Sequence, residues 1–337
     1  MEYYMRWRGV GVKALDGEYG GLTFQSDLRP SKEWFNFADY FTAPTQVIYA
    51  DMVARADPKA PLDQLWADLI EGIMGFYRLD GPRARILLNS PGDLIHRCPD
   101  SVVSWIRKLK ESGTRTFLLT GCDHHLAAPL AAYALGANWR ELFDLVLVDA
   151  RKPAFFTNSS IPFKAIREDG SLRTLSPDER LDAHTIYCGG NWSAVKDRWL
   201  GPDRRVLYVG DSLIDDIAAS QGLCDTIAVV EELALESSSS PVEEAKSEPS
   251  TTAEYLTCDK WGSVFASPLR PSYFTKVLCA GAKLVLSDVA QLVEISRDAR
   301  IPAFDKSGDV SLRGFYPSPP QSLAMLLKRS APSNGGH

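Results

Sequence analysis

Between residues 100 and 232, short apolar runs alternate with segments of helical periodicity, and this alternation limits the fold more than any other feature of the chain. The runs typical of buried strands are residues 114–120, 144–150, 205–211 and 225–232. Strands separated by helices form right-handed βαβ units, whose sheets are covered on both faces. We therefore predict an α/β fold with a parallel, Rossmann-like sheet and helices on both faces, and a loop-rich stretch between Arg151 and Asn191.

Polar residues follow three of these predicted strands. Thr120 ends the first strand, Lys152 lies just past the second, which contains Asp149, and Asp211 ends the third. Open α/β sheets bind their ligands at the carboxyl ends of the strands. We therefore expect these side chains at one edge of the sheet, where they could bind a phosphate group or a metal ion.

Two short motifs predict a phosphate site. Thr120 precedes Gly121, so that a hydroxyl lies beside a backbone amide that a ligand can approach closely. The ammonium group of Lys152 can neutralise a phosphate oxygen. The alternative for each is structural, because threonine is common at strand ends and lysine in exposed loops. Taken together, Thr120, Gly121 and Lys152 are the predicted phosphate-binding residues.

A pair of carboxylates in the segment YVGDSLIDDI predicts a magnesium site. Asp211 follows Gly210 at the strand end, and Asp216 on the next helix can return toward the same point. Mg²⁺ binds one or two carboxylates together with waters and phosphate oxygens. Asp215 is a second candidate for the role of Asp216, and the alternative for all three is that they cap a helix. Asp211 and Asp216 are the predicted metal ligands, with Mg²⁺ as the cofactor.

Charge, hydropathy and cysteine spacing exclude several classes of protein. The 37 basic and 43 acidic residues give a net charge of −6, which does not favour a nucleic acid partner. The longest stretch of small apolar residues, 126–137, is too short to span a membrane. The six cysteines are at least 21 positions apart, which excludes CxxC motifs and favours a reducing, cytoplasmic location. The oligomeric state stays open, and a homo-oligomer is compatible with the sequence.

The expected domain organisation follows composition. Residues 1–95 are predicted to form an irregular, aromatic-rich region that serves as a cap, and residues 96–235 the α/β core. Residues 236–254 contain no aromatic side chain and predict a disordered linker or insertion. Residues 255–330 are expected to pack on the core as a carboxyl-terminal segment, with strand-like runs at 261–265 and 283–289.

The order of the motifs resembles the haloacid dehalogenase-like (HAD-like) phosphatase superfamily. Threonine, then lysine, then GDxxxxD correspond to its second, third and fourth motifs, whereas receiver domains carry their acidic pair first. The blocks VDARKPAFF (148–156), IYCGGN (186–191) and VLYVGDSLIDDI (206–217) resemble the cytosolic purine 5′-nucleotidase branch. WGSVFASP (261–268) and GFYPSPP (314–320) resemble its "5′-nucleotidase domain-containing" subgroup. The resemblance implies Mg²⁺-dependent hydrolysis of a nucleoside monophosphate or another small phosphomonoester.

One departure from that superfamily concerns its first motif, DxDx(T/V), which supplies the nucleophile and the acid on the central strand. Asp51 and Asp288 follow apolar residues, but neither has a second aspartate two positions later. No catalytic residue is therefore identified. The resemblance implies a missing central strand between those ending in Thr120 and Asp211. It predicts an amino-terminally truncated chain with little or no phosphatase activity, the alternative being a pseudoenzyme that binds nucleotides without turnover.

Overall fold

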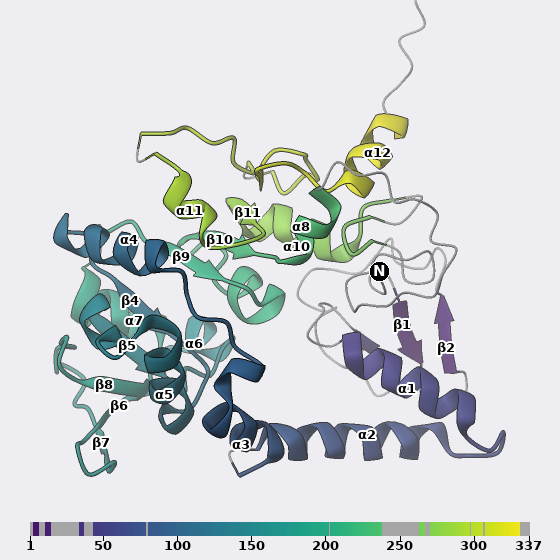
Figure 1. The fold of residues 1–337 in the computed structure, drawn as a ribbon, viewed down its shortest axis with the longest axis horizontal. Helices are drawn as coiled ribbons and strands as arrows, with labels where there is room; N and C mark the ends of the chain where they lie inside the picture. The colour runs from purple at the N-terminus through teal and green to yellow at the C-terminus, as the bar shows by residue number, and fades with distance from the viewer. Residues whose placement is uncertain are drawn as a thin grey trace, which may run out of the picture. The chain divides into compact units, whose positions relative to one another are not determined.

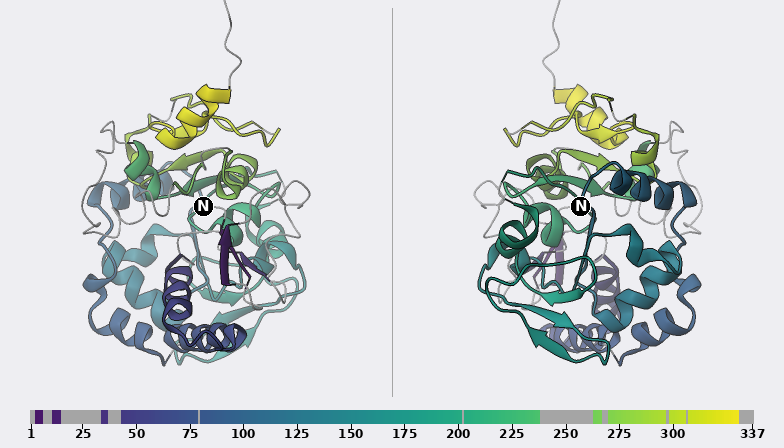
Figure 2. Two further views of the ribbon diagram at one scale, coloured as in Figure 1. Left: turned by 90° about the vertical axis from the view of Figure 1, so that its right-hand side faces the viewer. Right: turned by 90° about the vertical axis from the view of Figure 1, so that its left-hand side faces the viewer.

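The computed structural model describes most of the chain between Ala43 and Ser330 and three short strands before it (Figures 1 and 2). The described residues are 3–6, 11–14, 34–36, 43–78, 80–201, 203–237, 263–266, 270–296, 298–305 and 307–330. The chain divides into two compact units. Unit 1 comprises Met1–Glu71, Leu207–Asp288 and Ala299–His337, and unit 2 comprises Gly72–Val206 and Val289–Asp298. The predicted domain boundaries stay a prediction.

The sheet of unit 2 has five strands in the order β4-β5-β8-β6-β7. They are β4 (Phe117–Leu119), β5 (Leu145–Val148), β6 (Phe163–Ile166), β7 (Leu172–Thr174) and β8 (Ile186–Gly189). The first three in this order are parallel, and β6 and β7 extend the sheet in antiparallel pairing. All four residues of β5 are buried, as expected for a strand covered on both faces.

Unit 2 also contains helices, which pack on this sheet or on one another. The main ones are α3 (Pro82–Asn89), α4 (Asp100–Glu111) and α5 (His124–Leu135), and the shorter ones are α6 (Ala154–Thr157), α7 (Trp192–Val195) and α11 (Gln291–Glu294). Side chains of α4 and α5 pack with Leu118 and Val146 in one cluster. Because neighbouring strand residues point to opposite faces, Phe117 lies on the other face, where it contacts Trp192 and Trp199.

The main sheet of unit 1 has four parallel strands in the order β12-β11-β10-β9. They are β9 (Leu207–Gly210), β10 (Asp225–Val229), β11 (Leu284–Leu286) and β12 (Phe315–Tyr316). The π-helix η4 (Leu213–Ala218) packs closely on α10 (Tyr273–Gly281). A Cβ atom at Gly281 would lie 2.9 Å from the Ile217 side chain, so glycine permits this close approach. This part of unit 1 also contains the helices α8 (Glu232–Ser237) and α12 (Gln321–Ser330).

The amino-terminal part of unit 1 contains a second, antiparallel sheet and a helix. Its strands are β1 (Tyr3–Arg6), β2 (Gly11–Ala14) and β3 (Trp34–Asn36), and they precede α1 (Ala43–Arg55). The buried Tyr49 of α1 donates a hydrogen bond to the carbonyl oxygen of Leu62 (3.1 Å), where α2 (Leu62–Tyr77) begins. None of the described helices combines the length and the apolar character that crossing a membrane requires.

The predicted α/β class with parallel strands and flanking helices is confirmed. The stretch 151–191 has many loop residues, as predicted, but it also contains three strands that the prediction missed, β6, β7 and β8. The strand predicted at 261–265 is also wrong in its described part, where Ala266 forms only an isolated bridge with Pro271. Of the predicted linker, Glu236 and Ser237 end α8, and residues 238–254 lie outside the described residues.

The edge strands β4 and β9 bear on the predicted absent strand. Strand β4 ends the sheet of unit 2 and β9 ends the main sheet of unit 1, so each has one paired neighbour in the described sheets. On β9, Leu207 is 56% and Val209 is 36% exposed. These are the strands that the resemblance predicts on either side of the central strand. The absent strand itself stays a prediction.

Candidate functional site

The first part of the candidate site is the loop between β4 and α5 in unit 2. The hydroxyl oxygen of Thr120 accepts a hydrogen bond from the backbone N–H of Cys122 (3.1 Å), which closes a tight turn around Gly121. Asp123 then caps α5 by accepting a hydrogen bond from the backbone N–H of His125 (2.8 Å). In this bond the Thr120 oxygen is the acceptor. The hydroxyl proton therefore remains available to donate to a ligand.

Backbone hydrogen bonds tie this loop to the loop that follows β5. The N–H of Ala150 donates to the carbonyl oxygen of Thr120 (3.0 Å), and the N–H of Asp149 donates to that of Cys122 (2.9 Å). The N–H of Lys152 donates to the carbonyl oxygen of Ala150 (2.5 Å), so the chain turns directly after the tie. The structure thus brings Thr120, Gly121 and Lys152 to the same carboxyl edge of one sheet, as the sequence predicts.

Asp149 lies where these two loops meet and has an unusual backbone. Its φ angle of 45° lies in the left-handed region, and no other non-glycine residue in the described part of the chain has a positive φ. Such a conformation costs about 1 to 2 kcal/mol for an L-residue and persists only where surrounding contacts hold it. Here the bond from the Asp149 N–H to Cys122 does so. The sequence gives no signal for this strain, since aspartate at a strand end is ordinary.

The second part of the candidate site is the turn that follows β9 in unit 1. The Asp216 side chain is 1% exposed, and its carboxylate folds back over the end of the strand. One oxygen accepts a hydrogen bond from the hydroxyl of Tyr208 (2.6 Å), and the other accepts bonds from the backbone N–H groups of Asp211 (3.2 Å) and Ser212 (3.1 Å). Burial, and then the Asp216 carboxylate, raise the pKa of Tyr208, which keeps its hydroxyl a donor.

Gly210 is required for this arrangement. A Cβ atom built on Gly210 would lie 2.6 Å from both Cβ and Cγ of Asp216, closer than real atoms approach. The glycine of the GDxxxxD motif therefore makes space for the second aspartate. That motif thus encodes a packing contact, in addition to any chemistry of its carboxylates.

The two predicted metal ligands differ in access. Asp211 is exposed, whereas Asp216 is buried with hydrogen bonds to both of its oxygens. Asp215, the alternative, is half-buried, and its backbone N–H donates to the Ser212 hydroxyl at the start of η4. Among the described residues, no group of three or more His, Cys, Asp or Glu side chains is placed to hold a metal ion. The hard oxygen of an exposed carboxylate on a fixed turn does suit Mg²⁺, which needs only one or two such ligands.

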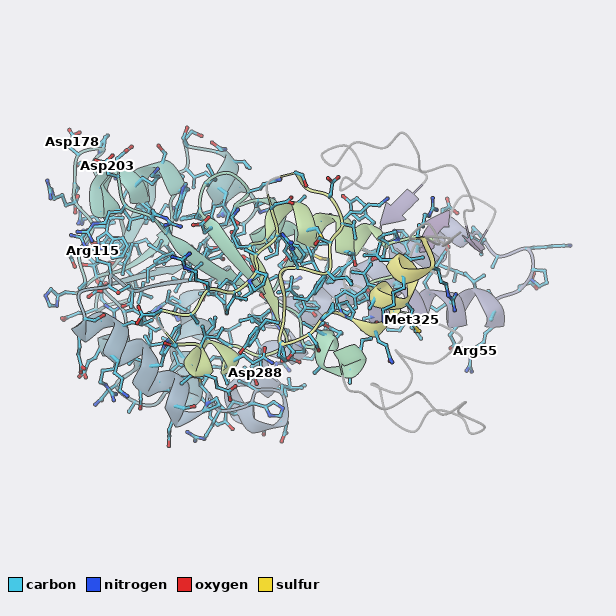
Figure 3. All side chains as sticks on the ribbon, turned by 90° about the horizontal axis from the view of Figure 1, so that it is seen from above. Arg55, Arg115, Asp178, Asp203, Asp288 and Met325 are labelled. Atoms are coloured by element: carbon cyan, nitrogen blue, oxygen red, sulfur yellow. The ribbon has the colours of Figure 1, made fainter. Side chains whose placement is uncertain are left out.

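The two remaining aspartates that follow apolar runs lie at different places in the fold, and neither belongs to a DxDx(T/V) motif. Asp51 lies within α1, where its carboxylate forms an exposed ion pair with Arg55 (2.8 Å). Asp288 is exposed and lies two residues beyond β11 (Figure 3). The predicted site residues therefore form two sets, the phosphate set in unit 2 and the acidic set in unit 1.

Comparison with known proteins identifies related chains over nearly the full length. The sequence pattern of the 5′ nucleotidase family matches residues 10–256. The protein named 5′-nucleotidase domain-containing protein 1 from Bos taurus is 26% identical over 372 aligned positions, which cover 96% of this chain and 79% of the relative. Its Homo sapiens counterpart is 25% identical and covers 87% and 72%. The human 5′-nucleotidase domain-containing protein 2 is 36% identical over 121 positions, which cover 35% of this chain and 23% of the relative.

Proposed function

Because the chain belongs to the 5′ nucleotidase family, we propose that it binds nucleoside 5′-monophosphates through their phosphate group. Family membership supports a nucleotidase-like function, and Thr120, Gly121 and Lys152 are the residues that we assign to the phosphate. The observation that carries the proposal is the pair of backbone hydrogen bonds between the loops after β4 and β5. These bonds hold the Thr120 and Gly121 loop beside the loop that carries Lys152, at one edge of the sheet.

Each of these residues has a defined task in phosphate binding. The half-buried Lys152 supplies a positive charge that neutralises a phosphate oxygen. Thr120 donates its hydroxyl proton to a second oxygen, because its own oxygen is already an acceptor for Cys122. Gly121 is exposed and presents no side chain, so the phosphate can approach the backbone closely. A rigid arrangement of this kind favours binding because little ordering is needed when the ligand arrives.

We further propose that Asp211 is a magnesium ligand and that Asp216 positions it. The support is the exposed carboxylate of Asp211 on a turn that the buried Asp216 fixes through two backbone N–H groups. When bound, Mg²⁺ supplies positive charge to phosphate oxygens. Titration of the chain with Mn²⁺, followed by the paramagnetic signal of the free ion, tests this assignment without any activity measurement. We expect saturable binding that Asp211→Asn abolishes and that Asp203→Asn, on an exposed loop, leaves unchanged.

We also propose that these 337 residues turn over phosphomonoesters slowly or not at all. The sequence contains no Asp-x-Asp pair, and the aspartate that attacks phosphorus in such enzymes therefore has no counterpart that we can assign. Loss of a covalent nucleophile commonly lowers turnover by a factor on the order of 10⁴ to 10⁶. Cytoplasmic location and a homo-oligomeric state stay predictions of the sequence.

The test combines calorimetric titration with a phosphate-release assay on a panel of nucleoside 5′-monophosphates in the presence of Mg²⁺. We expect saturable binding, with Kd raised about tenfold to a hundredfold in Lys152→Ala, because one charge-assisted contact is lost. Lys108→Ala removes the same charge from the exposed face of α4 and is expected to leave Kd unchanged.

The outcomes separate the parts of the proposal. Absence of binding, or an equal loss in both lysine variants, overturns the phosphate site. Steady phosphate release that Lys152→Ala abolishes retains the site but overturns the proposed lack of turnover. Binding without release supports the whole proposal.

A further inference from the structure

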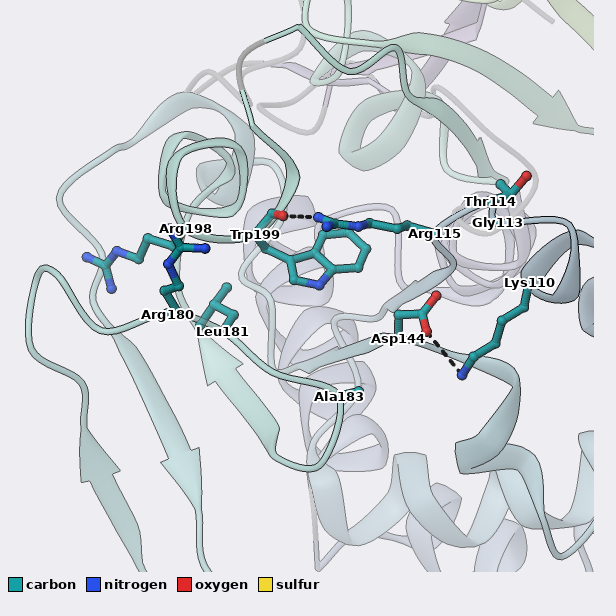
Figure 4. Close-up of a pocket in the computed structure, with 10 residues that line it drawn as sticks. All are labelled: Lys110, Gly113, Thr114, Arg115, Asp144, Arg180, Leu181, Ala183, Arg198 and Trp199. Carbon is teal, nitrogen blue, oxygen red and sulfur yellow. Dashed lines mark hydrogen bonds and ion pairs between the residues drawn. The ribbon is translucent and has the colours of Figure 1, made fainter.

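A cavity of about 480 Å³ opens in unit 2 (Figure 4). Its lining residues place it at the edge of the sheet opposite to the Thr120 and Lys152 loops. Its wall includes Thr114 and Arg115, which precede β4, together with Asp144, which directly precedes β5, and Ala183, which precedes β8. The cavity therefore lies at the amino ends of strands whose carboxyl ends carry the phosphate set. Its volume is in the range of pockets that hold small molecules, which is about 300 to 1,000 Å³.

Positive charge dominates the wall of this cavity. It contains four cationic side chains, Lys110, Arg115, Arg180 and Arg198, and one carboxylate, Asp144, although the chain as a whole is acidic. Asp144 is already engaged, since it forms an ion pair with Lys110 (3.1 Å) and accepts a hydrogen bond from the backbone N–H of Thr116 (2.9 Å). One cation is thus neutralised, and the charge of the three arginines remains.

Among the described residues the three arginines form no ion pair, although Arg198 lies near enough to Glu179 to contribute to lowering the pKa of that carboxyl. Arg115 donates to the carbonyl oxygen of Trp199, and Arg198 donates to that of Ser176 (3.3 Å). Arg180 is exposed and forms no ion pair in the described part of the chain. The nearby carboxylate of Glu179 is held by Arg173 in a bidentate pair (2.9 and 2.5 Å). The guanidinium groups therefore retain N–H groups that can donate hydrogen bonds to an anion.

Trp199 gives the cavity a fixed, flat wall between these cations. Its ring lies beneath the guanidinium of Arg115, at 5.6 Å from the ring centroid, and contacts the edge of Phe117 at 6.1 Å. In Figure 4, Arg115 lies on one side of Trp199, and Arg180 and Arg198 lie on the other. A second cavity of about 470 Å³ shares Arg180 and Arg198 but contains two carboxylates, Asp178 and Asp197. The charge balance thus favours the first cavity for an anion.

We propose that this cavity is a second ligand site, which binds a small molecule carrying two or more phosphate or carboxylate groups. Arg180 and Arg198 bind the anionic groups through the planar fork of their guanidinium nitrogens, which matches the oxygens of either group. Arg115 adds charge from the other side of the Trp199 ring. The site is separate from the proposed nucleotide site, because the strands between the two edges span about 10 Å.

The experiment titrates the full chain, carrying Lys152→Ala to weaken the other edge, with pyrophosphate by calorimetry at physiological salt. We expect saturable binding, with Kd raised about tenfold by Arg180→Ala and by Arg198→Ala, as each removes one charge-assisted contact. The matched control is Arg85→Ala on α3, another exposed arginine, whose side chain donates to the carbonyl oxygen of Asp80. Its Kd is expected to stay within about twofold, because a distant surface charge is screened.

Two further arms locate the ligand and identify its chemistry. A change in tryptophan fluorescence on binding is expected to vanish in Trp199→Phe while the calorimetric Kd changes little. Citrate in place of pyrophosphate tests whether carboxylate groups suffice, and chloride at matched ionic strength controls for screening.

Several results would overturn this second site. They are the absence of binding at millimolar pyrophosphate, an unchanged Kd in Arg180→Ala, or an equal loss in Arg85→Ala. Arg180 is exposed and has no ion pair in the part of the chain that the structure describes, so its removal tests the site without endangering the fold. Binding of pyrophosphate that survives Lys152→Ala also separates this proposal from the nucleotide site, since each can fail without the other.

Discussion

The loops of unit 2 and the turn after β9 in unit 1 both follow parallel strands and carry polar residues, yet they are held in different ways. In unit 2, backbone groups of the two loops bind one another, and the Thr120 hydroxyl forms a hydrogen bond within its own loop. In unit 1, a side chain, that of Asp216, binds the backbone and is buried in doing so. The first arrangement leaves functional groups accessible, whereas the second uses one of its two acids for stability.

The largest effect that this comparison predicts is that of Asp216→Ala. The substitution leaves the Tyr208 hydroxyl and two backbone N–H groups without their acceptor in a buried site. We expect the free energy of unfolding to fall by about 3 to 4 kcal/mol, because each unsatisfied buried donor is costly. Urea denaturation measured by far-ultraviolet circular dichroism gives this value.

The control for Asp216→Ala is the loss of an exposed acid. Asp203→Ala removes the same charge from an exposed position before β9 and is expected to change the free energy of unfolding by less than about 0.5 kcal/mol. Tyr208→Phe removes only one of the three bonds and is expected to cost about 1 kcal/mol. Equal stability of the wild type and Asp216→Ala would show that Asp216 does not hold the turn.

Gly210 and Gly121 allow a second test of the difference between the two regions, with a smaller expected change in the free energy of unfolding. A Cβ atom at Gly210 would overlap Asp216 at 2.6 Å, whereas one at Gly121 would lie 3.7 Å from the Ala150 carbonyl oxygen, an ordinary contact. We expect Gly210→Ala to lower the free energy of unfolding by about 1 to 3 kcal/mol through overpacking. Gly121→Ala is expected to leave it within about 0.5 kcal/mol while weakening nucleotide binding. Similar destabilisation by both variants, measured by denaturation, contradicts this distinction.

Much of the fold could be predicted because its parallel strands are continuous apolar runs. The buried β5 and the partly exposed β9 lie inside such runs, and the helices α4 and α5 have the expected periodicity. Strand β8 escaped the prediction because it has only four residues, Ile186–Gly189, and because the pair Gly189 and Gly190 at its end is typical of a loop. Its neighbours along the sheet, β5 and β6, determine its conformation, and sequence periodicity does not contain that information.

The site could be predicted in its residues but not in their roles. Strand ends with Thr120, Lys152 and Asp211 are visible in the sequence because polar residues stand out after apolar runs. The sequence does not show that Asp211 is exposed and Asp216 is buried. The burial of Asp216 depends on where Tyr208 and the backbone N–H groups lie in space. The arginine-lined cavity was not predicted either, because Arg115, Arg180 and Arg198 are brought together from separate loops.

The smallest effect that we predict is a pH dependence at the first turn of α5, next to the accessible loops of unit 2. Burial first, and then the charges of His125 and Arg140, lower the pKa of His124, and its Nδ1 has no hydrogen-bond partner in the described structure. The fold therefore favours the neutral ring. Its contribution to stability is complete above the unfolded pKa of about 6.5 and is lost as the pH falls toward the lower folded pKa.

Partial exposure of His124 limits this contribution to less than about 1 kcal/mol. The measurement compares the free energy of unfolding of wild type and His124→Gln between about pH 5 and pH 7.5. The variant is expected to lose less stability on acidification than the wild type, and His184→Gln, in the exposed loop before β8, is expected to follow the wild type. Parallel curves for all three chains would mean that the first turn of α5 tolerates a charged ring. The positive end of the helix dipole and the nearby Arg140 both oppose that result, since each disfavours a cation at this position.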